Sequence, residues 1–411
     1  MSIYSIDGKP TSNLCFGFVV ASNLAGTVEN ITNNADVTCV CPDDSYAQSR
    51  AAIVGWNAPG GFVRNCINNG AITFDLANHT AQTAYIGTVV ARAQSGADTV
   101  PAGLYNLENH GKLTINITDG LTNKNFYIGG VSGSANSYTV VDNCKNYADV
   151  TFNINNDKDK GALVCMGGVI GYSAGDISNC YNEGNVKFDG LCKSVYSGGV
   201  GDFKGSIAAG IVGYQNAALT NCINKGDITI TGNRFGGRNS LGGIDGTKSK
   251  SSAAPAVAGI VGYCYKATVD GCENHGKITY HQPNGDTSGT AGIHLAAGVV
   301  ASTWGNVTNC KNFGEIEVVR KYATANVNSY LYVGGIAASD YYPLTQNESS
   351  IIDCVNEGNI TVDNDLGTSN SAYGGIVGWP GWENAGQTNV TERCVNKGNL
   401  VINGNAKVRC G

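Results

Sequence analysis

The chain has 411 residues, and its composition excludes several classes of protein. Glycine is abundant (57), whereas Met (2), Pro (8) and charged residues (14%) are scarce, which argues against a helical fold. The formal net charge of −6 gives no basic surface, so we expect no nucleic-acid partner. The sequence lacks a run of about 18 apolar residues, so we expect no membrane span either.

The first residues, Met-Ser-Ile-Tyr-Ser-Ile-Asp, lack a charged segment followed by an apolar stretch. A secretory signal peptide would need both. The sequence is therefore compatible with a protein that stays inside its cell. It is equally compatible with a mature or trimmed chain that begins with an added Met.

One imperfect repeat then runs through the chain. Segments of the form Asn-Cys-x-Asn-x-Gly-x-Ile-Thr-Ile align ten times, with neighbouring anchor positions 35 to 50 residues apart. That spacing is typical of solenoids and propellers. The anchors are Ile31, Cys66, Leu107, Cys144, Cys180, Cys222, Cys272, Cys310, Cys354 and Cys394.

Each repeat contains three short apolar segments that we predict to be strands. The first has the form Gly-Ile-Val-Gly-Tyr, as in residues 168–172, 210–214, 259–263 and 375–379. The second surrounds an apolar position three residues before the anchor. The third follows the anchor and alternates, with apolar side chains six and eight residues after it and Thr between them in seven copies. Alternation with period two indicates a half-buried strand.

A corner separates the second and third predicted strands. Asn stands two residues after the anchor in all ten copies, and Gly stands four residues after it in eight. Asn and Gly both tolerate left-handed backbone, so we predict a tight turn at this pair. Stacked asparagines can also bond from one coil to the next.

These elements predict an all-β protein: a right-handed parallel β-helix, or β-solenoid, of about ten three-stranded coils. We expect residues 1–411 to form a single solenoid domain. The Asn corner lacks the hairpin signal of a propeller blade, and right-handed connections are the rule between parallel strands. Insertions fall at two corners, at 189–207, 231–257, 281–296, 319–332, 93–103, 340–350 and 380–390. Loops that stack along one edge often form the binding face of a repeat protein.

The fifteen cysteines could indicate disulfides or a metal site. Eight occupy the anchor position, where Ile31 and Leu107 replace them in the other copies. A position that accepts Ile or Leu needs a small buried apolar residue, which a free Cys provides. CxxC or CxxH spacing is missing from this column. We therefore predict no metal and no cofactor, and a bridge remains open among Cys15, Cys165, Cys192, Cys264 and Cys410.

Parallel β-helices host polysaccharide lyases and hydrolases, whose active sites need positioned carboxylates. The position five residues after the anchor holds Asp36, Asp149, Asp227 and Glu315, but Asn fills it in other copies. These acids do not cluster in adjacent repeats, and the five histidines form no catalytic pattern. We predict no catalytic residue.

The strongest binding signal is aromatic. The residue that closes Gly-Ile-Val-Gly is aromatic in five copies, and such a row could stack sugar rings. The alternative is that the rings pack beneath the insertions, because Arg92, Ser134, Ser302 and Ser339 interrupt the row. The predicted ligand-binding residues are Trp56, Tyr172, Tyr214, Tyr263 and Trp379. The outward Thr column also raises an ice-binding interpretation, which Lys187, Glu317 and Val401 interrupt.

The pairing of Gly-Ile-Val-Gly-Tyr with Ile-x-Asn-Cys-x-Asn-x-Gly-x-Ile resembles the GLUG-type repeats of bacterial cell-surface proteins. Residues 375–379 followed by 394–398 show the likeness well. The resemblance implies an adhesin-like β-solenoid with an extracellular or cell-surface location, although the chain shows no signal peptide. The zinc motif of the peptidase members is absent from this sequence.

The sequence leaves three functions open. The first is a non-enzymatic structural or adhesive module that binds a host or bacterial surface glycan or protein through its loop edge. The second is a polysaccharide-active lyase or hydrolase. The third is a fibre or phage-type assembly subunit that self-associates through open solenoid ends, since such ends present unpaired strand edges.

Overall fold

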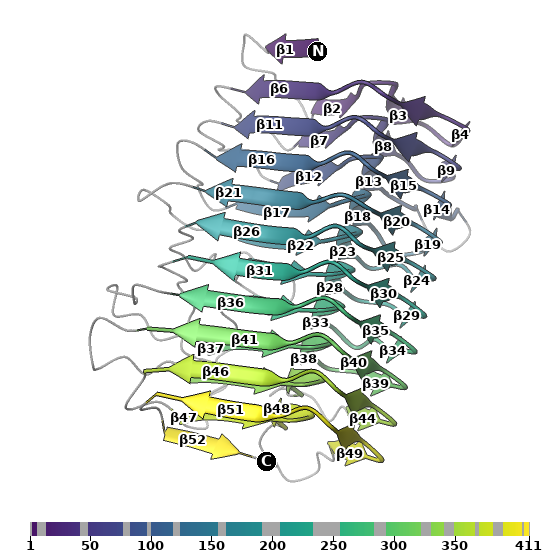
Figure 1. Cartoon of the computed structure of the whole chain (residues 1–411). Helices are drawn as coiled ribbons and strands as arrows, with labels where there is room; N and C mark the ends of the chain where they lie inside the picture. Colours follow the sequence, from purple (N-terminus) through teal and green to yellow (C-terminus); the bar gives the residue numbers. More distant parts are fainter. Residues whose placement is uncertain are drawn as a thin grey trace.

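A computed structural model describes residues 2–5, 14–41, 48–76, 83–96, 100–117, 124–154, 162–190, 206–232, 255–282, 293–321, 330–340, 349–365, 370–380, 389–404 and 407–410. These residues form 52 strands arranged in five parallel sheets, and none of them is helical. The strands form a long stack, and the two chain ends lie at opposite ends of this stack (Figure 1).

We name the sheets A to E. Sheet A contains β1 (Ser2–Ser5), β6 (Val37–Cys41), β11 (Ile72–Leu76), β16 (Leu113–Ile117), β21 (Val150–Ile154), β26 (Val186–Gly190), β31 (Ile228–Thr231), β36 (Ile278–Gln282), β41 (Ile316–Arg320), β46 (Ile360–Asn364) and β51 (Leu400–Asn403). Sheet B contains β2 (Leu14–Gly17), β7 (Gln48–Ala51), β12 (Thr83–Gly87), β17 (Lys124–Gly129), β22 (Ala162–Gly167), β27 (Ser206–Ala209), β32 (Ala256–Ala258), β37 (Ile293–Ala297), β42 (Tyr330–Gly334), β47 (Asn370–Gly374) and β52 (Lys407–Cys410).

Sheet C contains β3 (Val20–Asn23), β8 (Val54–Asn57), β13 (Val90–Ala93), β18 (Ser132–Ala135), β23 (Ile170–Ser173), β28 (Val212–Gln215), β33 (Val261–Cys264), β38 (Val300–Thr303), β43 (Ala337–Ser339) and β48 (Val377–Trp379). Sheet D contains β4 (Thr27–Glu29), β9 (Phe62–Arg64), β14 (Ala102–Tyr105), β19 (Thr139–Asp142), β24 (Ile177–Ser178), β29 (Leu219–Thr220), β34 (Val269–Asp270), β39 (Asn306–Thr308), β44 (Ser350–Ile352) and β49 (Val390–Glu392). Sheet E contains β5 (Thr32–Asn33), β10 (Ile67–Asn68), β15 (Glu108–Asn109), β20 (Lys145–Asn146), β25 (Tyr181–Asn182), β30 (Ile223–Asn224), β35 (Glu273–Asn274), β40 (Lys311–Asn312), β45 (Val355–Asn356) and β50 (Val395–Asn396).

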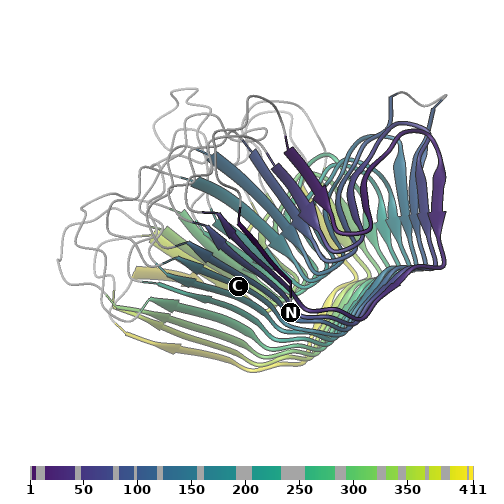
Figure 2. The same ribbon diagram turned by 90° about the horizontal axis from the view of Figure 1, so that it is seen from above.

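The chain visits the sheets in the order B, C, D, E, A and then starts the next coil. We number the coils from 1 (β2–β6) to 10 (β47–β51), so that each repeat anchor lies just before the sheet E strand of its coil. Seen from above, successive coils follow the same path (Figure 2). The parallel β-solenoid is thus present, but a coil has five strands rather than the predicted three. Strands of two residues, such as those of sheet E, are too short to show a period in the sequence.

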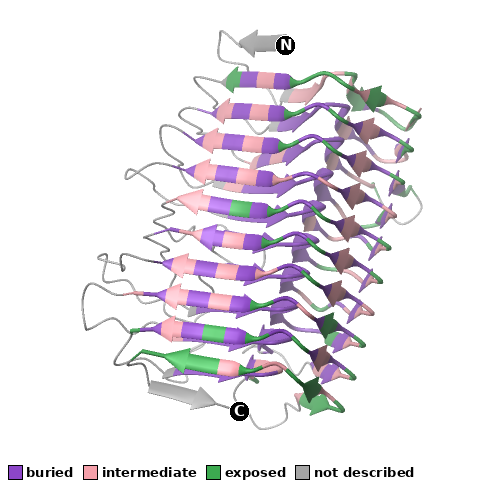
Figure 3. Cartoon of the chain, viewed as in Figure 1, coloured by how far each residue is buried: buried purple, intermediate pink, exposed green. Residues whose placement is uncertain are grey.

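The main core lies inside the coil. In sheet A the alternation seen in the sequence becomes a buried–intermediate alternation along each strand (Figure 3). The apolar position three residues before the anchor also faces inward, with Val63, Leu104 and Val141 fully buried. The Thr between the two apolar positions faces outward, as predicted.

The left-handed residue of the corner is neither the Asn nor the Gly for which the sequence predicts it. Positive φ occurs at the residue immediately before each anchor, for example 50° at Asn65 and 54° at Asn179. The Asn two residues after the anchor lies within a sheet E strand. The Gly that follows it, such as Gly226, is required by close approach instead, because a Cβ there would collide with the carbonyl oxygen of Gly184 in the preceding coil.

The ten sheet E asparagines form one ladder of hydrogen bonds inside the solenoid. The Nδ2 of each of the first nine donates to the Oδ1 of the next coil's Asn at 2.7 to 2.9 Å. Each Nδ2 also donates to the carbonyl oxygen two residues further along its own chain, as in Asn182 to Gly184 at 2.8 Å. The eight interior members are fully buried, so both amide hydrogens must be satisfied in this way. The predicted asparagine ladder is confirmed.

The ladder also explains the first Gly of Gly-Ile-Val-Gly. A Cβ on Gly210 would collide with the side chain of Asn224 and with the carbonyl oxygen of Gly259. The interior is therefore narrow at this point, where the bend between sheets B and C meets sheet E. In coils 4 to 10 the two halves of the repeat motif fit together, because this Gly leaves room for the amide of the ladder. Coils 2 and 3 instead carry Ala52 and Thr88 at the equivalent position.

The anchor cysteines are core residues, as predicted. Seven are buried and Cys394 is half-buried. Each thiol donates to the carbonyl oxygen two residues before it at 3.1 to 3.7 Å, so Cys adds a weak donor at a corner where Ile or Leu would add only volume. All twelve cysteines with described side chains are free thiols. Cys192 lies outside the described residues, and the side chain of Cys410 is likewise not described.

Candidate functional site

The predicted aromatic row lies on sheet C, on the side of the strand opposite the main core. The register pairs Trp56, Arg92, Ser134, Tyr172, Tyr214, Tyr263, Ser302, Ser339 and Trp379 in one column. The three consecutive tyrosines stack on one another, with ring centroids 5.2 Å apart between Tyr172 and Tyr214 and 5.3 Å apart between Tyr214 and Tyr263.

A second column, which the sequence analysis missed, fills the gaps in this row. It lies on sheet B, seven residues before each sheet C position, and is also paired in register. Wherever sheet C carries Ser or Arg, sheet B usually carries Tyr, and wherever sheet C carries an aromatic ring, sheet B carries a smaller residue. The pairs are Ser49/Trp56, Tyr85/Arg92, Tyr127/Ser134, Cys165/Tyr172, Ile207/Tyr214, Ala256/Tyr263, Leu295/Ser302, Tyr332/Ser339 and Ala372/Trp379.

Together the two columns form what we call the aromatic seam. The ring of Tyr127 lies 5.5 Å from that of Tyr85 in the coil before it and 5.0 Å from that of Tyr172 in the coil after it. The ring of Tyr332 stacks on Trp379 at 5.3 Å. In coil 8, where neither column is aromatic, Trp304 places its ring 6.2 Å from that of Tyr263.

The seam is a second apolar core, separate from the main one. Tyr214 and Tyr263 are each only 2% exposed, whereas Trp56, Tyr172 and Trp379 are half-buried. Burial raises the pKa of the Tyr127, Tyr172 and Tyr214 hydroxyls, so these groups stay protonated. Each ring of the central run already has ring neighbours on both faces, which favours the packing interpretation of the row. Ligand binding by its half-buried members stays a prediction.

If the two columns form one seam, each coil should accept an aromatic ring from either sheet B or sheet C. Tyr127→Ala should lower the free energy of unfolding by about 3 to 5 kcal/mol, as removal of a buried aromatic ring does. Adding Ser134→Tyr to that variant should restore at least half of the loss, because the ring returns to the same coil from the other sheet. Ser134→Tyr alone should destabilise by about 1 to 3 kcal/mol through overpacking. Urea unfolding of the four proteins measures this, and a double variant no more stable than Tyr127→Ala would refute the seam rule.

Three of the four acidic residues considered for catalysis, Asp36, Asp149 and Asp227, have structural roles. At the position five residues after the anchor, the side-chain oxygen accepts a hydrogen bond from the backbone N–H at the same position of the next coil. Asp149 accepts from Asn185 at 3.1 Å, and Asp227 accepts from Lys277 at 2.8 Å. Asn185 serves Asp227 in the same way at 2.9 Å. Asp and Asn both serve at this position because the bond needs only an acceptor, whereas Lys112 and Lys277 in the same column cannot provide one.

Asp340 is the one described carboxyl group whose pKa is shifted upward. It follows β43 and is fully buried, and burial raises its pKa to about 7. The Ser349 hydroxyl donates to its Oδ1, while Oδ2 has no hydrogen-bond partner. A buried carboxyl group with a raised pKa is a site candidate, but this one is closed off from solvent.

Asp340 predicts a pH dependence of stability. Because its folded pKa is raised from 3.8 to about 7, its contribution is fully present below pH 3.8 and is lost as the pH rises through 7. Asp340→Asn should therefore stabilise the protein at pH 8 by up to about 4 kcal/mol and have little effect at pH 4. Thermal unfolding at both pH values tests this. Asp353→Asn is the control, because Arg393 lowers the pKa of that carboxyl group and any effect should be a loss of stability above its folded pKa.

The outward face of sheet E also carries stacked rings, but these lie at the protein surface. We define the outer E face as the residues one, three and five positions after each anchor. In coil 3, His110 places its Nε2 3.3 Å from Glu108 and stacks on Tyr147 of coil 4 at 4.7 Å. Lys145 reaches back to Glu108 at 3.7 Å. Here rings, carboxylates and ammonium groups lie together at the surface.

Metal ligands do not converge in the described part of the chain. No group of three or more His, Cys, Asp or Glu side chains there could hold an ion. The described residues also contain no helix long and apolar enough to cross a membrane.

Residues 162–187 match the family model described as the GLUG motif. They run from the first strand of coil 5, β22, into its last strand, β26. The chain carries a GLUG motif. The matched GLUG segment is thus nearly one complete coil, and the columns described above repeat its features along the chain. No curated protein and no solved structure matches the chain.

Proposed function

We propose that this GLUG-repeat solenoid is a non-enzymatic structural and adhesive module, displayed at a cell surface and binding a glycan or protein partner. The observation that carries the proposal is that the two sides of each strand have different roles: the inward side joins the coils, and the outward side is available to a partner. Inward columns hold the coils together through the asparagine ladder, the cysteine column and the aromatic seam. On the outer E face, by contrast, charge and ring content differ between neighbouring coils, so that a fixed scaffold carries a surface with its own pattern.

Two outward regions are the places for a partner. The outer E face carries exposed charged and aromatic side chains. The insertion loops are the edge at which the sequence analysis predicted binding, and residues 191–205, 233–254, 283–292 and 322–329 within them lie outside the described residues. Either region would present its side chains repeatedly along a stiff stack, which favours multivalent binding.

Two measurements test this proposal. The full chain should bind selected glycans or proteins on an array of host and bacterial surface molecules, and antibodies should label it on intact source cells. An array without binding would contradict the adhesive role. Labelling that requires permeabilised cells would contradict surface display.

A polysaccharide lyase or hydrolase is the alternative from a different class. Asp340 is the described acid with a pKa suited to proton transfer near neutrality, which is the observation in its favour. Against it, the group is fully buried and could not reach a bound polymer. Release of reducing ends from a panel of polysaccharides, abolished by Asp340→Asn, would establish the enzyme instead.

An assembly subunit is the second alternative. In coil 10, Val395, Val401 and Ile402 are 48%, 47% and 36% exposed, whereas Val362, the counterpart of Ile402 in coil 9, is fully buried. An exposed apolar coil favours stacking on a second copy. Light scattering that finds only monomers at high protein concentration would remove this alternative.

A further inference from the structure

From coil 3 to coil 10, the outer E face repeats with a period of four coils. The residues one, three and five positions after the anchor are Glu-His-Lys, Lys-Tyr-Asp, Tyr-Glu-Asn and Ile-Lys-Asp in coils 3 to 6. In coils 7 to 10 they are Glu-His-Lys, Lys-Phe-Glu, Val-Glu-Asn and Val-Lys-Asn. Each of coils 3 to 6 thus has a similar coil four coils later, whereas coils 1 and 2 carry Thr-Asn-Asp and Ile-Asn-Ala and lie outside this pattern. The segments are 108–112, 145–149, 181–185 and 223–227, then 273–277, 311–315, 355–359 and 395–399.

The geometry repeats with the sequence. In coils 7 and 8, His275 places its Nε2 3.2 Å from Glu273 and stacks on Phe313 at 4.6 Å and 15°. The equivalent pair of His110 and Tyr147 stacks at 4.7 Å and 12°. Lys311 reaches back to Glu273 at 3.1 Å, as Lys145 does to Glu108. The two constellations are therefore copies of one arrangement.

The period is absent from other columns of the same coils. Between the apolar positions of sheet A, Thr151 of coil 4 corresponds to Glu317 of coil 8, and Lys187 of coil 5 corresponds to Thr361 of coil 9. The seam differs as well, since coil 4 carries Tyr127 where coil 8 carries Leu295. A four-coil copy by itself would have left all columns alike. The four-coil period is therefore a property of the outer E face and is not shared by the sheet A and seam columns.

Coil stability does not require this order. The ion pairs of the two constellations lie at the surface, where each contributes about 0 to 1 kcal/mol. Other coils are braced by different exposed pairs, such as Arg393 with Asp353. A partner molecule that contacts this face at the same four-coil spacing accounts for the period better than coil stability does.

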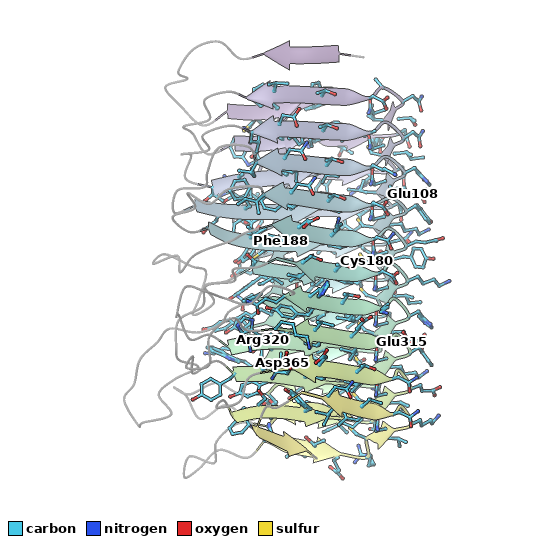
Figure 4. All side chains as sticks on the ribbon, turned by 60° about the vertical axis from the view of Figure 1, so that its left-hand side comes forward. Glu108, Cys180, Phe188, Glu315, Arg320 and Asp365 are labelled. Carbon is cyan, nitrogen blue, oxygen red and sulfur yellow. The ribbon has the colours of Figure 1, made fainter. Side chains whose placement is uncertain are left out.

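We propose that the outer E face binds a linear, uncharged polysaccharide that lies along the stack, with equivalent contacts at coils 3–4 and at coils 7–8. Four strands at about 4.8 Å give a spacing of about 19 Å between the two constellations. This deepens the proposed adhesive function and rests on it. In Figure 4, Glu108 of the first constellation and Glu315 beside the second lie along the same edge of the stack and point away from it.

The charge and side-chain types on this face select the ligand class. Coils 7 to 10 carry Glu273, Glu315 and Glu357 against Lys277, Lys311 and Lys397, a balance of zero, and coils 3 to 6 carry one more acid than base. A nearly neutral face gives no attraction for a polyanion or a polycation. Lys and Glu are depleted in protein–protein interfaces, whereas carboxylates, amides and ammonium groups bond sugar hydroxyls and aromatic rings cover sugar C–H surfaces.

The test measures binding of the full chain to xylan, mannan and hydroxyethyl cellulose. The variants are His110→Ala, His275→Ala and the double variant, with Asn69→Ala as the matched control from the same column of coil 2. Both histidine side chains are exposed, at 42% and 36%, so an unchanged thermal midpoint should accompany each change. Lys145→Ala is a second probe of the first constellation.

For at least one polysaccharide we expect each single histidine variant to lose about tenfold in affinity, the double variant over a hundredfold, and the control less than twofold, because two linked contacts multiply. Fragments shorter than the spacing should bind weakly and alike to both single variants. A polysaccharide that binds all variants equally would overturn this inference and leave the adhesive function in place on another surface. If none of the three binds, the inference is overturned, while the surface-molecule array still decides the proposed function.

Discussion

Asn182→Ala is expected to lower the free energy of unfolding by at least about 3 kcal/mol. The change removes two bonds donated by Asn182, to Gly184 and to Asn224, and one accepted from Asn146. It leaves three buried polar groups without these partners, and each such group costs about 1 to 3 kcal/mol. Urea unfolding followed by tyrosine and tryptophan fluorescence measures the loss.

Asn153→Ala is the control for the ladder. Asn153 also donates to an asparagine of the neighbouring coil, Asn116 at 2.9 Å, but it does so on the outward face of sheet A. Water replaces that bond, so the cost should stay below about 0.5 kcal/mol. Equal losses in the two variants would mean that the buried ladder contributes no more than a surface bond.

Tyr214→Ala is expected to destabilise the protein by about 3 to 5 kcal/mol. The ring is 2% exposed and stacks between those of Tyr172 and Tyr263, so its loss leaves a cavity in the middle of the seam. Tyr214→Phe should cost less than about 1.5 kcal/mol, since ring volume is retained.

The same pair of variants distinguishes the seam from a ligand site. If the ring packs in the seam, Tyr214→Ala lowers the unfolding midpoint, and Tyr214→Phe leaves it close to that of the parent chain. If the ring serves only to stack sugars, both variants unfold like the parent chain. That second result would contradict the seam as a second core.

The sequence predicted the features that depend on period and polarity. The parallel solenoid, the buried anchor cysteines and the Asn ladder follow from columns that repeat in nearly every coil. A column occupied by Cys, Ile or Leu can only be a core position, and an invariant Asn within a repeat can only bond to its copies or to its own chain.

Features that depend on distance between columns were missed. The strands of sheets B and E were not predicted, so a coil of five strands was expected to have three. Sheet E strands have only two residues, which is too short to show alternation. Several sheet B strands overlap ranges that were predicted to be insertions, as Ile293–Ala297 does with 281–296. The left-handed corner was placed at Asn182 and its equivalents because Asn tolerates positive φ, yet the Asn before the anchor has that property too.

The aromatic seam cannot be predicted from the sheet C column alone. The signal was present: the residue seven positions earlier is large where the row is small, as at Tyr127 and Ser134, and small where the row is large, as at Cys165 and Tyr172. Recognising it needs the knowledge that sheets B and C approach each other across the bend. The four-coil period of the outer E face was likewise readable only once sheet E was known to separate that face from the core.

The central claim is that one buried hydrogen-bonded asparagine ladder joins the coils. Hydrogen exchange of the asparagine side-chain amides, followed by NMR on the ¹⁵N-labelled chain, tests it most directly. Asn109, Asn146, Asn182 and Asn224 should exchange at least about a hundredfold more slowly than Asn153, because their release requires coils to separate. Ladder amides that exchange as fast as Asn153 would contradict the account.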